Sequence, residues 1–545
     1  MILKSRQYQT DLETAIYNSW AEGHQNTLAV LPTGGGKTWV FSNIIKKHIG
    51  SSVAIAHRQE IVSQISLSFA KHGIYHQILA PDNVIKTINK QHIEEIGESF
   101  YHPHAKTAVA GVRTLLSRRK KLSHWFNSVT LWVQDEAHHV LRSNEWGRAA
   151  ALFPNAKGLG VTATAGRADG KGLGAHADGV MLNMVLGPAP RDLINQKYLA
   201  DYRIFAPPSD LDMTGVNIGS NGDYTRPGTV KAVRKSTVTG DVIKHYLRIA
   251  PGKLGITFTV DVQTATETAA LFNAAGVPAA VCSAKTPDAE RVQILRKFRN
   301  REILMLVNVA LFDEGFDVPG VEVICMAQPT KSFARFAQQF GRALRPDGDK
   351  IAIIIDHVGN CMFHGLPDAP RVWTLDRRER TSKTKPSDVI PVKSCPQCTA
   401  VYERIYKVCP YCAHAPKPMA RSGPEYVDGD LNELDAATLA AMRGEAVNLD
   451  MTPAEYLSTS GAGHLPHIAA MSAAKQFRLK QEAQTALRES IALWAGYQKF
   501  YGRPDSESYR RFYFKFGVDV LSAQALNARD ALALKLVVDN SVNIK

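Results

Sequence analysis

The sequence predicts two successive α/β domains, each built on a parallel sheet, followed by a small cysteine-rich module and a mainly helical C-terminal region. Two observations predict the sheets: short apolar runs alternate with amphipathic stretches through the first 190 residues, and the alternation returns between 254 and 356. Strands and helices that alternate along a chain form parallel, doubly wound sheets. A third observation, four cysteines between 395 and 412, predicts the module that follows the second sheet.

Buried strands are expected where short apolar runs lie between turn residues. In the first domain these runs are 27–32, 52–57, 107–112, 129–134 and 157–164. In the second domain they are 254–260, 277–283, 302–309, 321–328 and 351–356. The expected boundaries are 1–200 for the first domain, 201–240 for a connector rich in glycine, proline and aspartate, 241–380 for the second domain, 390–420 for the cysteine module and 421–545 for the helical region.

The composition favours a nucleic-acid partner over a membrane. At 545 residues the chain is too long for a single hydrophobic core. Its formal net charge is +14 at pH 7, and an excess of this size indicates a polyanionic partner. No apolar run approaches the roughly 20 residues of a transmembrane helix, and the start, MILKSRQYQT, does not resemble a signal peptide. We therefore expect a cytoplasmic protein with no membrane partner.

The stretch LPTGGGKT (31–38) has the context of a phosphate-binding loop, since it follows one expected strand and opens a helix. Glycines let backbone N–H groups face phosphate oxygens, and the helix N-terminus adds its positive dipole. Leu31 stands where the strict pattern has glycine, so a chance glycine-rich turn is the alternative. The candidate contacts are Thr33, Gly34, Gly35, Gly36, Lys37 for the β and γ phosphates, and Thr38 for Mg²⁺.

Two adjacent carboxylates, Asp135 and Glu136, follow the expected strand 129–134. Acidic residues also favour the first turn of a helix, which is the structural alternative. A nucleotide bound with Mg²⁺, however, needs an acidic group near the phosphate loop. We therefore expect Asp135 to hold Mg²⁺ through water, and Glu136 to orient the water that attacks the γ-phosphate.

Four motifs occur in an order that is typical of superfamily 2 helicases. PTGGGKT, DEAH, TAT (162–164) and QQFGRALR (338–345) resemble motifs I, II, III and VI of that family. The resemblance covers roughly residues 1–375. It is strongest to RadD-type bacterial repair helicases, phage-encoded DEAD/DEAH-box helicases and the motor subunits of restriction enzymes. It implies two tandem RecA-like motor domains that use ATP, in a bacterial or phage-infected cell.

The resemblance also implies roles for single residues. SRQYQ (5–9) resembles the adenine-contacting element, and NVALFDEGFDVP (308–319) resembles motif V. Ala165 follows TAT where the family has proline, which puts in doubt the coupling of hydrolysis to movement. The implied nucleotide contacts are Arg6, Gln9, Gly315 and Asp317; the coupling residues are His138, Thr162, Thr164 and Gln338; and the nucleic-acid contacts are Arg58, Thr114 and Thr257.

Arg342 and Arg345 in QQFGRALR have the chemistry of arginine fingers. Each guanidinium is able to neutralise the charge that develops on a transferred phosphoryl group. Their spacing of three residues predicts that both lie on one helical face. The alternative is a pair of surface arginines, but Gln338 and Gly341 complete the family pattern Q-x-x-G-R-x-x-R.

The cysteine cluster follows the pattern C-x₂-C-x₁₀-C-x₂-C. Four thiolates suit a closed, tetrahedral Zn²⁺ site, here formed by Cys395, Cys398, Cys409 and Cys412. Two unrelated hairpin turns and a redox C-x-x-C are weaker alternatives, because no thioredoxin-like context surrounds the motif. The nearby Arg404, Lys407, Tyr402, Tyr406 and Tyr411 either contact nucleic acid or only pack a zinc ribbon, and the sequence does not decide between the two.

The C-terminal region is expected to be helical. Residues 475–497 place Phe477, Leu479, Ala483, Leu487 and Ile491 near helical spacing. Further on, aromatic residues alternate with cations. We expect the aromatic residues Tyr509, Phe512 and Phe516 to pack, and Arg510, Arg511 and Lys515 to be candidate phosphate contacts.

The sequence therefore favours an ATP-dependent DNA helicase or translocase in replication, recombination or repair, with ATP, Mg²⁺ and Zn²⁺ as cofactors. Branched or partly single-stranded DNA is the expected substrate, and single-stranded-DNA-binding or other replication and repair proteins are expected partners. The alternatives are a double-stranded-DNA translocase subunit of a restriction or defence system, which does not separate strands, and an RNA helicase.

Overall fold

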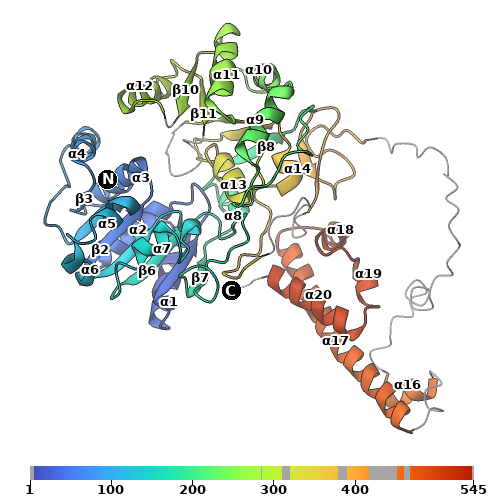
Figure 1. The fold of residues 1–545 in the computed structure, drawn as a ribbon. Coiled ribbons are helices and arrows are strands. Elements are labelled where there is room, and N and C mark those ends of the chain that lie inside the picture. Colours follow the sequence, from blue (N-terminus) through green and yellow to red (C-terminus); the bar gives the residue numbers. More distant parts are fainter. Residues whose placement is uncertain are drawn as a thin grey trace. The chain divides into compact units, whose positions relative to one another are not determined.

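The structure is a computed structural model. It describes residues 5–283, 285–309, 320–378, 390–416, 451–459 and 467–542. The chain divides into two compact units, which are described separately. The first contains residues 1–368, 373–385 and 398–401, and the second contains 369–372, 386–397 and 402–545. Figure 1 shows the first sheet of the first unit in blue and cyan and the second sheet in green and yellow.

The first sheet has seven parallel strands in the order β3-β4-β2-β5-β6-β1-β7. All five strands that the sequence predicts for this domain are present. The sheet also contains β3 and β7, which the sequence does not predict. The strands are β1 (Asn26–Val30), β2 (Ser51–Ala56), β3 (Gln77–Leu79), β4 (Thr107–Gly111), β5 (Val129–Gln134), β6 (Lys157–Thr162) and β7 (Asn183–Leu186).

Helices join all consecutive strands of this sheet except β6 and β7. The helices are α1 (Gln7–Ala21), α2 (Lys37–Lys47), α3 (Gln59–Lys71), α4 (Asp82–Ile96), α5 (Val112–Ser117), α6 (Ser123–Ser128), the 3₁₀ turn η1 (Ala137–His139), α7 (Glu145–Ala150) and α8 (Pro190–Asn195). The core between sheet and helices includes Trp132 and Met181, both almost completely buried.

The second sheet has six parallel strands in the order β10-β11-β9-β12-β13-β8. The strands are β8 (Asp201–Phe205), β9 (Gly255–Phe258), β10 (Ala279–Ser283), β11 (Met305–Val309), β12 (Val323–Met326) and β13 (Ile351–Asp356). Residues 201–205 are therefore an edge strand of this sheet, and the prediction that the connector begins at 201 is wrong. Short edge strands carry a weak apolar signal because one side of the strand has no partner.

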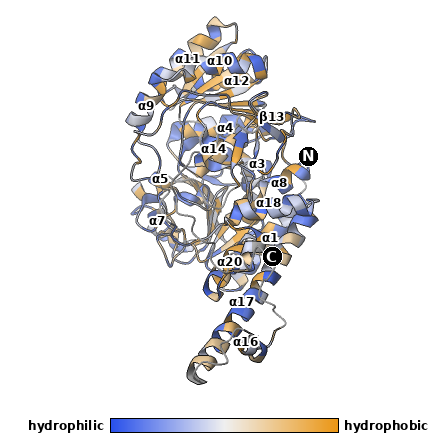
Figure 2. Cartoon of the chain, turned by 90° about the vertical axis from the view of Figure 1, so that its right-hand side faces the viewer, coloured by the Kyte–Doolittle hydropathy of each residue, from blue (hydrophilic) through white to orange (hydrophobic). Residues whose placement is uncertain are grey.

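The helices of the second domain are α9 (Arg226–Lys235), α10 (Val238–Ile249), α11 (Val262–Ala274), α12 (Asp288–Arg299), α13 (Phe333–Gly341) and α14 (Asn360–His364). Tyr246 and Phe272 meet edge to face in the core of this domain, with ring centroids 5.5 Å apart. Figure 2 shows hydrophilic and hydrophobic residues side by side on helices such as α11. Two sheets with separate cores confirm the predicted tandem α/β architecture.

The second unit contains the C-terminal helices α16 (Pro453–Thr459), α17 (His467–Phe500), α18 (Asp505–Phe516), α19 (Val520–Ala523) and α20 (Ala528–Ser541). Their core contains Leu487, Trp494 and Phe512, so the predicted packing of Phe512 is confirmed. Tyr509 is 57% exposed, so its predicted packing is wrong. None of the described helices is long and apolar enough to cross a bilayer.

Arg511 is also not a phosphate contact in this arrangement. It is 7% exposed and forms ion pairs with Glu403 at 2.6 Å and with Glu507 at 2.9 Å. Tyr402 is buried, and Tyr406 donates to the Glu507 carboxylate at 3.4 Å. Arg511 and Tyr406 therefore join the cysteine module to α18.

Candidate ATP site and cysteine cluster

The phosphate loop joins β1 to α2. Gly34 and Gly36 have φ angles of +84° and +88°, in the left-handed region that favours glycine. A Cβ atom on Gly36 would lie 2.5 Å from Nε2 of Gln9 and would collide with it. The left-handed backbone conformation therefore favours glycine at both positions of the turn.

Lys37 is the first residue of α2, and Gly36 is its N-cap. The Lys37 Nζ atom donates to the carbonyl of Leu31 at 3.4 Å, so the amine folds back over the loop. Thr38 follows in the first turn, and both side chains are half-buried. A helix N-terminus, a lysine amine and a hydroxyl beside one glycine-rich loop fit a polyphosphate with its cation.

The N-terminal element that the sequence predicts for adenine lies directly on this loop. The side chains of Gln9 and Tyr8 both donate to the carbonyl of Gly35, at 3.3 and 2.8 Å. The Arg6 guanidinium lies over the ring of Tyr198, 4.7 Å from its centroid. The sequence motif SRQYQ identifies this element, but it gives no signal for Tyr198, which comes from beyond α8.

Asp135 and Glu136 lie at the carboxyl end of β5, which is separated from β1 by β6. Both residues are buried. Glu136 has a φ of +50°, which is uncommon for a residue other than glycine. Its backbone N–H donates to Oδ1 of Asp135 at 2.9 Å, so the turn itself holds the Asp135 carboxylate.

The electrostatics of this pair suit a bound cation. Burial, and then the neighbouring Glu136 carboxylate, raise the pKa of Asp135 above its ordinary value, while the Lys37 ammonium opposes this shift. A buried pair of carboxylates is costly when both are ionised, and a divalent cation removes that cost. The donor chemistry of Asp135 and Thr38 therefore fits Mg²⁺.

A chain of polar contacts links the carboxylates to the TAT motif. Nδ1 of His138 lies 3.4 Å from Oε2 of Glu136 and 3.0 Å from Oγ1 of Thr162. The Thr162 hydroxyl in turn lies 3.0 Å from the carbonyl of Thr164 and donates to it. Three of the four residues that the family resemblance assigns to coupling, His138, Thr162 and Thr164, therefore form one connected group in the first domain.

The second domain reaches this group through α13. Nε2 of Gln338 donates to Oε2 of Glu136 at 3.0 Å. A Cβ atom on Gly341 would lie 2.5 Å from Cβ of Thr33, so the backbone of α13 touches the phosphate loop and only glycine fits there. The stretch that resembles motif VI thus contacts the stretches that resemble motifs I and II. These stretches are far apart in the sequence, so the sequence alone could not show the contact.

Arg342 is buried and Arg345 is half-buried, and burial lowers the pKa of Arg345 from its ordinary value. The prediction that the two share one helical face is wrong, because α13 ends at Gly341. Arg342 is the C-cap of α13 and keeps a helical backbone, whereas Arg345 lies in the segment beyond. The helix ends before Arg345, so a spacing of three residues no longer places the two side chains on the same face.

The three predicted nucleic-acid contacts differ in how far they are buried. Thr257 is completely buried in β9, and its hydroxyl donates to Sδ of Met305 at 3.2 Å. Its assignment to nucleic acid is wrong, since a side chain inside the sheet core is not accessible. Arg58 caps α3 and Thr114 lies in α5; both are half-buried and follow the carboxyl ends of strands. The predicted contacts Gly315 and Asp317 lie outside the described residues.

Asp223, in the connector, is a residue that the sequence does not single out. It is 4% exposed and accepts hydrogen bonds from Oγ1 of Thr330 at 2.8 Å, from the backbone N–H of Lys331 at 2.7 Å and from Arg335 at 2.8 Å. These donors lie at the start of α13. The turn sequence NGD indicates a loop here but gives no signal for its partners.

The four clustered cysteines come together as predicted. Sγ atoms of Cys395, Cys398, Cys409 and Cys412 all lie within 4.8 Å of one another, and those of Cys395 and Cys412 are 3.6 Å apart. Zn–S bonds of about 2.3 Å in a tetrahedron place sulfurs about 3.8 Å apart. The cluster therefore has the donors and the spacing of a closed four-thiolate metal site.

Comparisons with known proteins agree with this geometry. Residues 2–167 match the family model "Type III restriction enzyme, res subunit", and residues 239–347 match "Helicase conserved C-terminal domain". A 51.5 kDa protein of a Lactococcus phage (isolate 7-9) is 32% identical over 386 residues, which are 70% of this chain and 76% of the phage protein.

Two cellular relatives align over similar lengths. "Putative ATP-dependent helicase IRC3" of Saccharomyces cerevisiae is 28% identical, over 67% of this chain and 53% of the yeast protein. "DNA 3'-5' translocase XPB2" of Sulfurisphaera tokodaii is 24% identical, over 70% of this chain and 86% of that protein. The chain thus spans about half the length of the yeast relative. With both domain models matched in order, the chain belongs to the superfamily 2 helicases, ATP-dependent enzymes that act on nucleic acid.

Proposed function

We propose that the protein is an ATP-driven DNA helicase or translocase whose ATP site is completed by the second domain. The observation that carries this proposal is the contact of α13 with the first domain, where Gln338 donates to Glu136 at 3.0 Å and Gly341 lies against Thr33. A site formed by two domains is able to open and close with nucleotide, and closure of this kind converts hydrolysis into motion.

Each residue of the site has a role in this proposal. Lys37 neutralises the β and γ phosphates, while Thr38 and Asp135 would hold Mg²⁺, which would supply charge neutralisation on the phosphate oxygens. Glu136 orients the attacking water, and its bond to Gln338 fixes the carboxylate in the closed arrangement. Arg342 and Arg345 approach the γ-phosphate from the second domain and stabilise the charge that develops there.

DNA is the favoured nucleic acid. The archaeal relative is named a DNA translocase, and the motifs resemble those of RadD-type repair helicases. The match to a protein named an RNA helicase, from Methanocaldococcus jannaschii, covers only 12% of this chain. We therefore place the activity on branched or partly single-stranded DNA, in replication, recombination or repair.

Binding to DNA is expected to be independent of sequence and to weaken steeply with salt. Each neutralised phosphate contributes roughly −0.9 to the log–log slope on duplex and roughly −0.7 on single strands, so several contacts give a slope steeper than about −3. Anisotropy titrations across salt, with forked DNA, blunt duplex and RNA of matched sequence, measure this slope. A flat salt response contradicts backbone binding, and tighter binding with faster ATP turnover on RNA favours the RNA-helicase alternative.

A translocase that does not separate strands is the second candidate, because the first domain matches the res subunit of a restriction enzyme. Strand displacement on forked DNA and triplex displacement on duplex DNA distinguish the two. A helicase displaces the strand of the fork, whereas a pure duplex translocase removes the third strand of the triplex and leaves the fork paired.

The cysteine cluster is proposed to hold one structural Zn²⁺ that folds the module. Elemental analysis of the purified protein should find about one equivalent of zinc, and Cys395→Ser should lose it, because three thiolates close the tetrahedron poorly. Cys282→Ser is the matched control, since Cys282 is buried in the second sheet and should not change the zinc content. Wild-type protein without metal, prepared with zinc under reducing conditions, would rule this out.

A further inference from the structure

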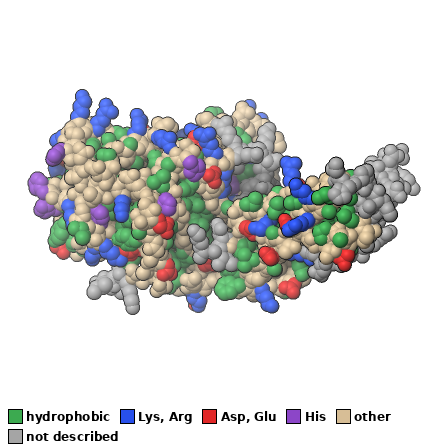
Figure 3. Space-filling view, turned by 90° about the horizontal axis from the view of Figure 1, so that it is seen from below, with side chains coloured by type: hydrophobic (Ala, Val, Ile, Leu, Met, Phe, Trp, Pro, Cys, Tyr) green, Lys and Arg blue, Asp and Glu red, His purple; other side chains and the backbone are tan. Residues whose placement is uncertain are grey.

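Helix α9 is the most basic of the short helices that flank the second sheet. Its sequence, RPGTVKAVRK, begins directly after the connector turn. Thr229 and Val233 are buried and attach the helix to the domain. The four basic residues, Arg226, Lys231, Arg234 and Lys235, are all exposed. Figure 3 shows other Lys and Arg side chains, in blue, at several separate places.

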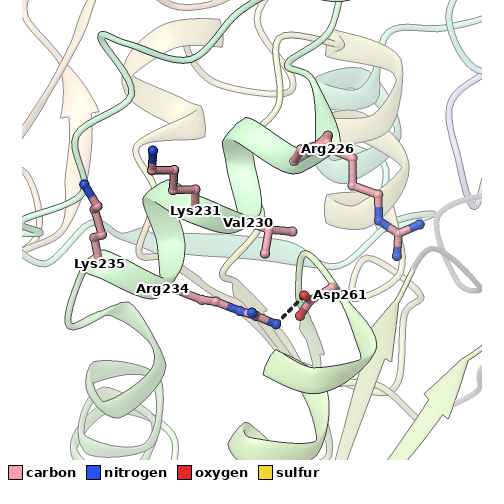
Figure 4. A pocket seen from close by; sticks show the side chains of 7 residues that line it. Arg226, Val230, Lys231, Arg234, Lys235 and Asp261 are labelled. Atoms are coloured by element: carbon pink, nitrogen blue, oxygen red, sulfur yellow. Dashed lines mark hydrogen bonds and ion pairs between the residues drawn. The ribbon is translucent and has the colours of Figure 1, made fainter.

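The four cations of α9 line one open hollow of about 720 Å³, together with Pro227, Val230 and Asp261. Figure 4 shows the basic side chains projecting from α9, with Arg234 directed toward Asp261. Asp261 is the carboxylate of this lining. It accepts from Arg234 at 2.8 Å and also caps α11 by accepting from the N–H of Thr264 at 2.8 Å. The Asp261 carboxylate is therefore already paired with Arg234 and with the backbone of α11.

The lining of the hollow holds these four cations and one carboxylate, that of Asp261. Among the described residues, Arg226, Lys231 and Lys235 form no ion pair. Arg234 is held in place by Asp261 and by Oε1 of Gln263 at 2.6 Å. One oriented guanidinium beside three unpaired cations attracts an external anion, because like charges gathered at one place create a positive potential.

The length of the basic row indicates a chain of anions rather than a single one. Lys235 lies nine positions after Arg226 on the helix, which is a rise of about 13.5 Å at about 1.5 Å per residue. A nucleic-acid strand carries one phosphate for about every 3.4 Å of helix axis. The row therefore matches the phosphates of several successive nucleotides, whereas one nucleotide would leave part of it unpaired.

The hollow also lies near the carboxyl ends of the strands, a position that suits this ligand. Asp261 caps α11 just after the carboxyl end of β9, and β9 pairs in parallel with β12, whose carboxyl end leads to α13. In parallel α/β sheets, ligands bind at the carboxyl ends of strands. In addition, Asp223 lies three residues before α9 and holds the start of α13. The basic row is thus connected to the helix that touches the phosphate loop.

We propose that α9 binds the sugar–phosphate backbone of the nucleic acid on which the motor acts, through Arg226, Lys231, Arg234 and Lys235. This inference rests on the proposed function and adds a contact surface outside the recognised helicase motifs. Binding there holds the strand beside the connector that carries Asp223, so α9 and α13 move together when the two domains close.

The test compares two double variants of the full chain. Lys231→Gln/Lys235→Gln removes two charges from α9. Arg248→Gln/Lys297→Gln, the control, removes two exposed charges from the last turns of α10 and α12. These helices lead to the amino ends of β9 and β11, so the control charges lie at the opposite end of the strands of the same sheet. Both variants are first checked by thermal melting. Anisotropy with labelled DNA is then measured from about 50 to 200 mM salt.

The α9 variant is expected to reduce the magnitude of the log–log slope by about 1.4 on single strands and about 1.8 on duplex, two contacts at 0.7 or 0.9 each. The control variant should keep the wild-type slope, and both should keep the wild-type rate of ATP hydrolysis without DNA. Equal slopes for the α9 variant and wild type, or equal losses in the two variants, would overturn the role of α9. Wild-type protein that neither binds DNA nor responds to it in ATP hydrolysis would instead refute the proposed function itself.

Discussion

Replacing Glu136 by glutamine should lower the rate of DNA-stimulated ATP hydrolysis by about 10²–10⁴-fold, the usual contribution of a positioned acid–base group. The change keeps the size of the side chain, and an amide is still able to meet Gln338, which donates to the carboxylate at 3.0 Å in the wild type. What disappears is the negative charge that we propose orients the attacking water. ATP binding, measured with a fluorescent nucleotide, should therefore remain close to wild type.

Glu145→Gln is the matched control, since it removes one carboxylate of the first domain that is paired at the surface with Arg113. Its rate of hydrolysis should equal that of the wild type. If Glu136→Gln also hydrolysed ATP at the wild-type rate, Glu136 would have no role in orienting the water.

Arg342→Ala should lower ATP hydrolysis by on the order of 10³–10⁵-fold if this arginine acts in full on the transferred phosphoryl group, and by less if Arg345 shares the task. Arg342 is buried at the end of α13, the helix that contacts both Glu136 and Thr33. Arg342→Lys should recover only part of the rate, because an ammonium lacks the planar fork of the guanidinium.

Arg248→Ala, on α10 of the same domain, serves as the comparison because Arg248 is exposed in the last turn of that helix. It should leave steady-state hydrolysis unchanged. Wild-type hydrolysis and translocation in Arg342→Ala would show that the second domain contributes no arginine to the ATP site.

The architecture could be predicted from the sequence because ten buried strands carry strong, continuous apolar runs. In the two large sheets, the strands that escaped prediction are β3, β7 and β8, which all lie at sheet edges. An edge strand such as β8 alternates exposed and buried residues over only five positions. So short a pattern is not distinguishable from a loop by periodicity alone.

The sequence predicted which residues belong to the candidate ATP site, but not which of them contact one another. The glycines and Lys37 follow from local geometry, since a phosphate loop needs a strand, a turn and a helix in order. The bond between Gln338 and Glu136 joins residues 202 positions apart, so no local pattern contains it. The errors have the same origin: Thr257 is buried by neighbouring strands, and Arg345 lies beyond the end of α13.

We propose that the second domain completes an ATP site in the first domain, and that nucleic acid stimulates ATP turnover at this site. The most direct measurement is steady-state ATP turnover by the full chain with Mg²⁺, with and without forked DNA, in the wild type and in Lys37→Ala. DNA should accelerate turnover by the wild type, and Lys37→Ala should show none under either condition, because the β and γ phosphates lose their neutralising amine. Equal wild-type rates with and without DNA or RNA, or turnover that survives Lys37→Ala, would contradict the claim.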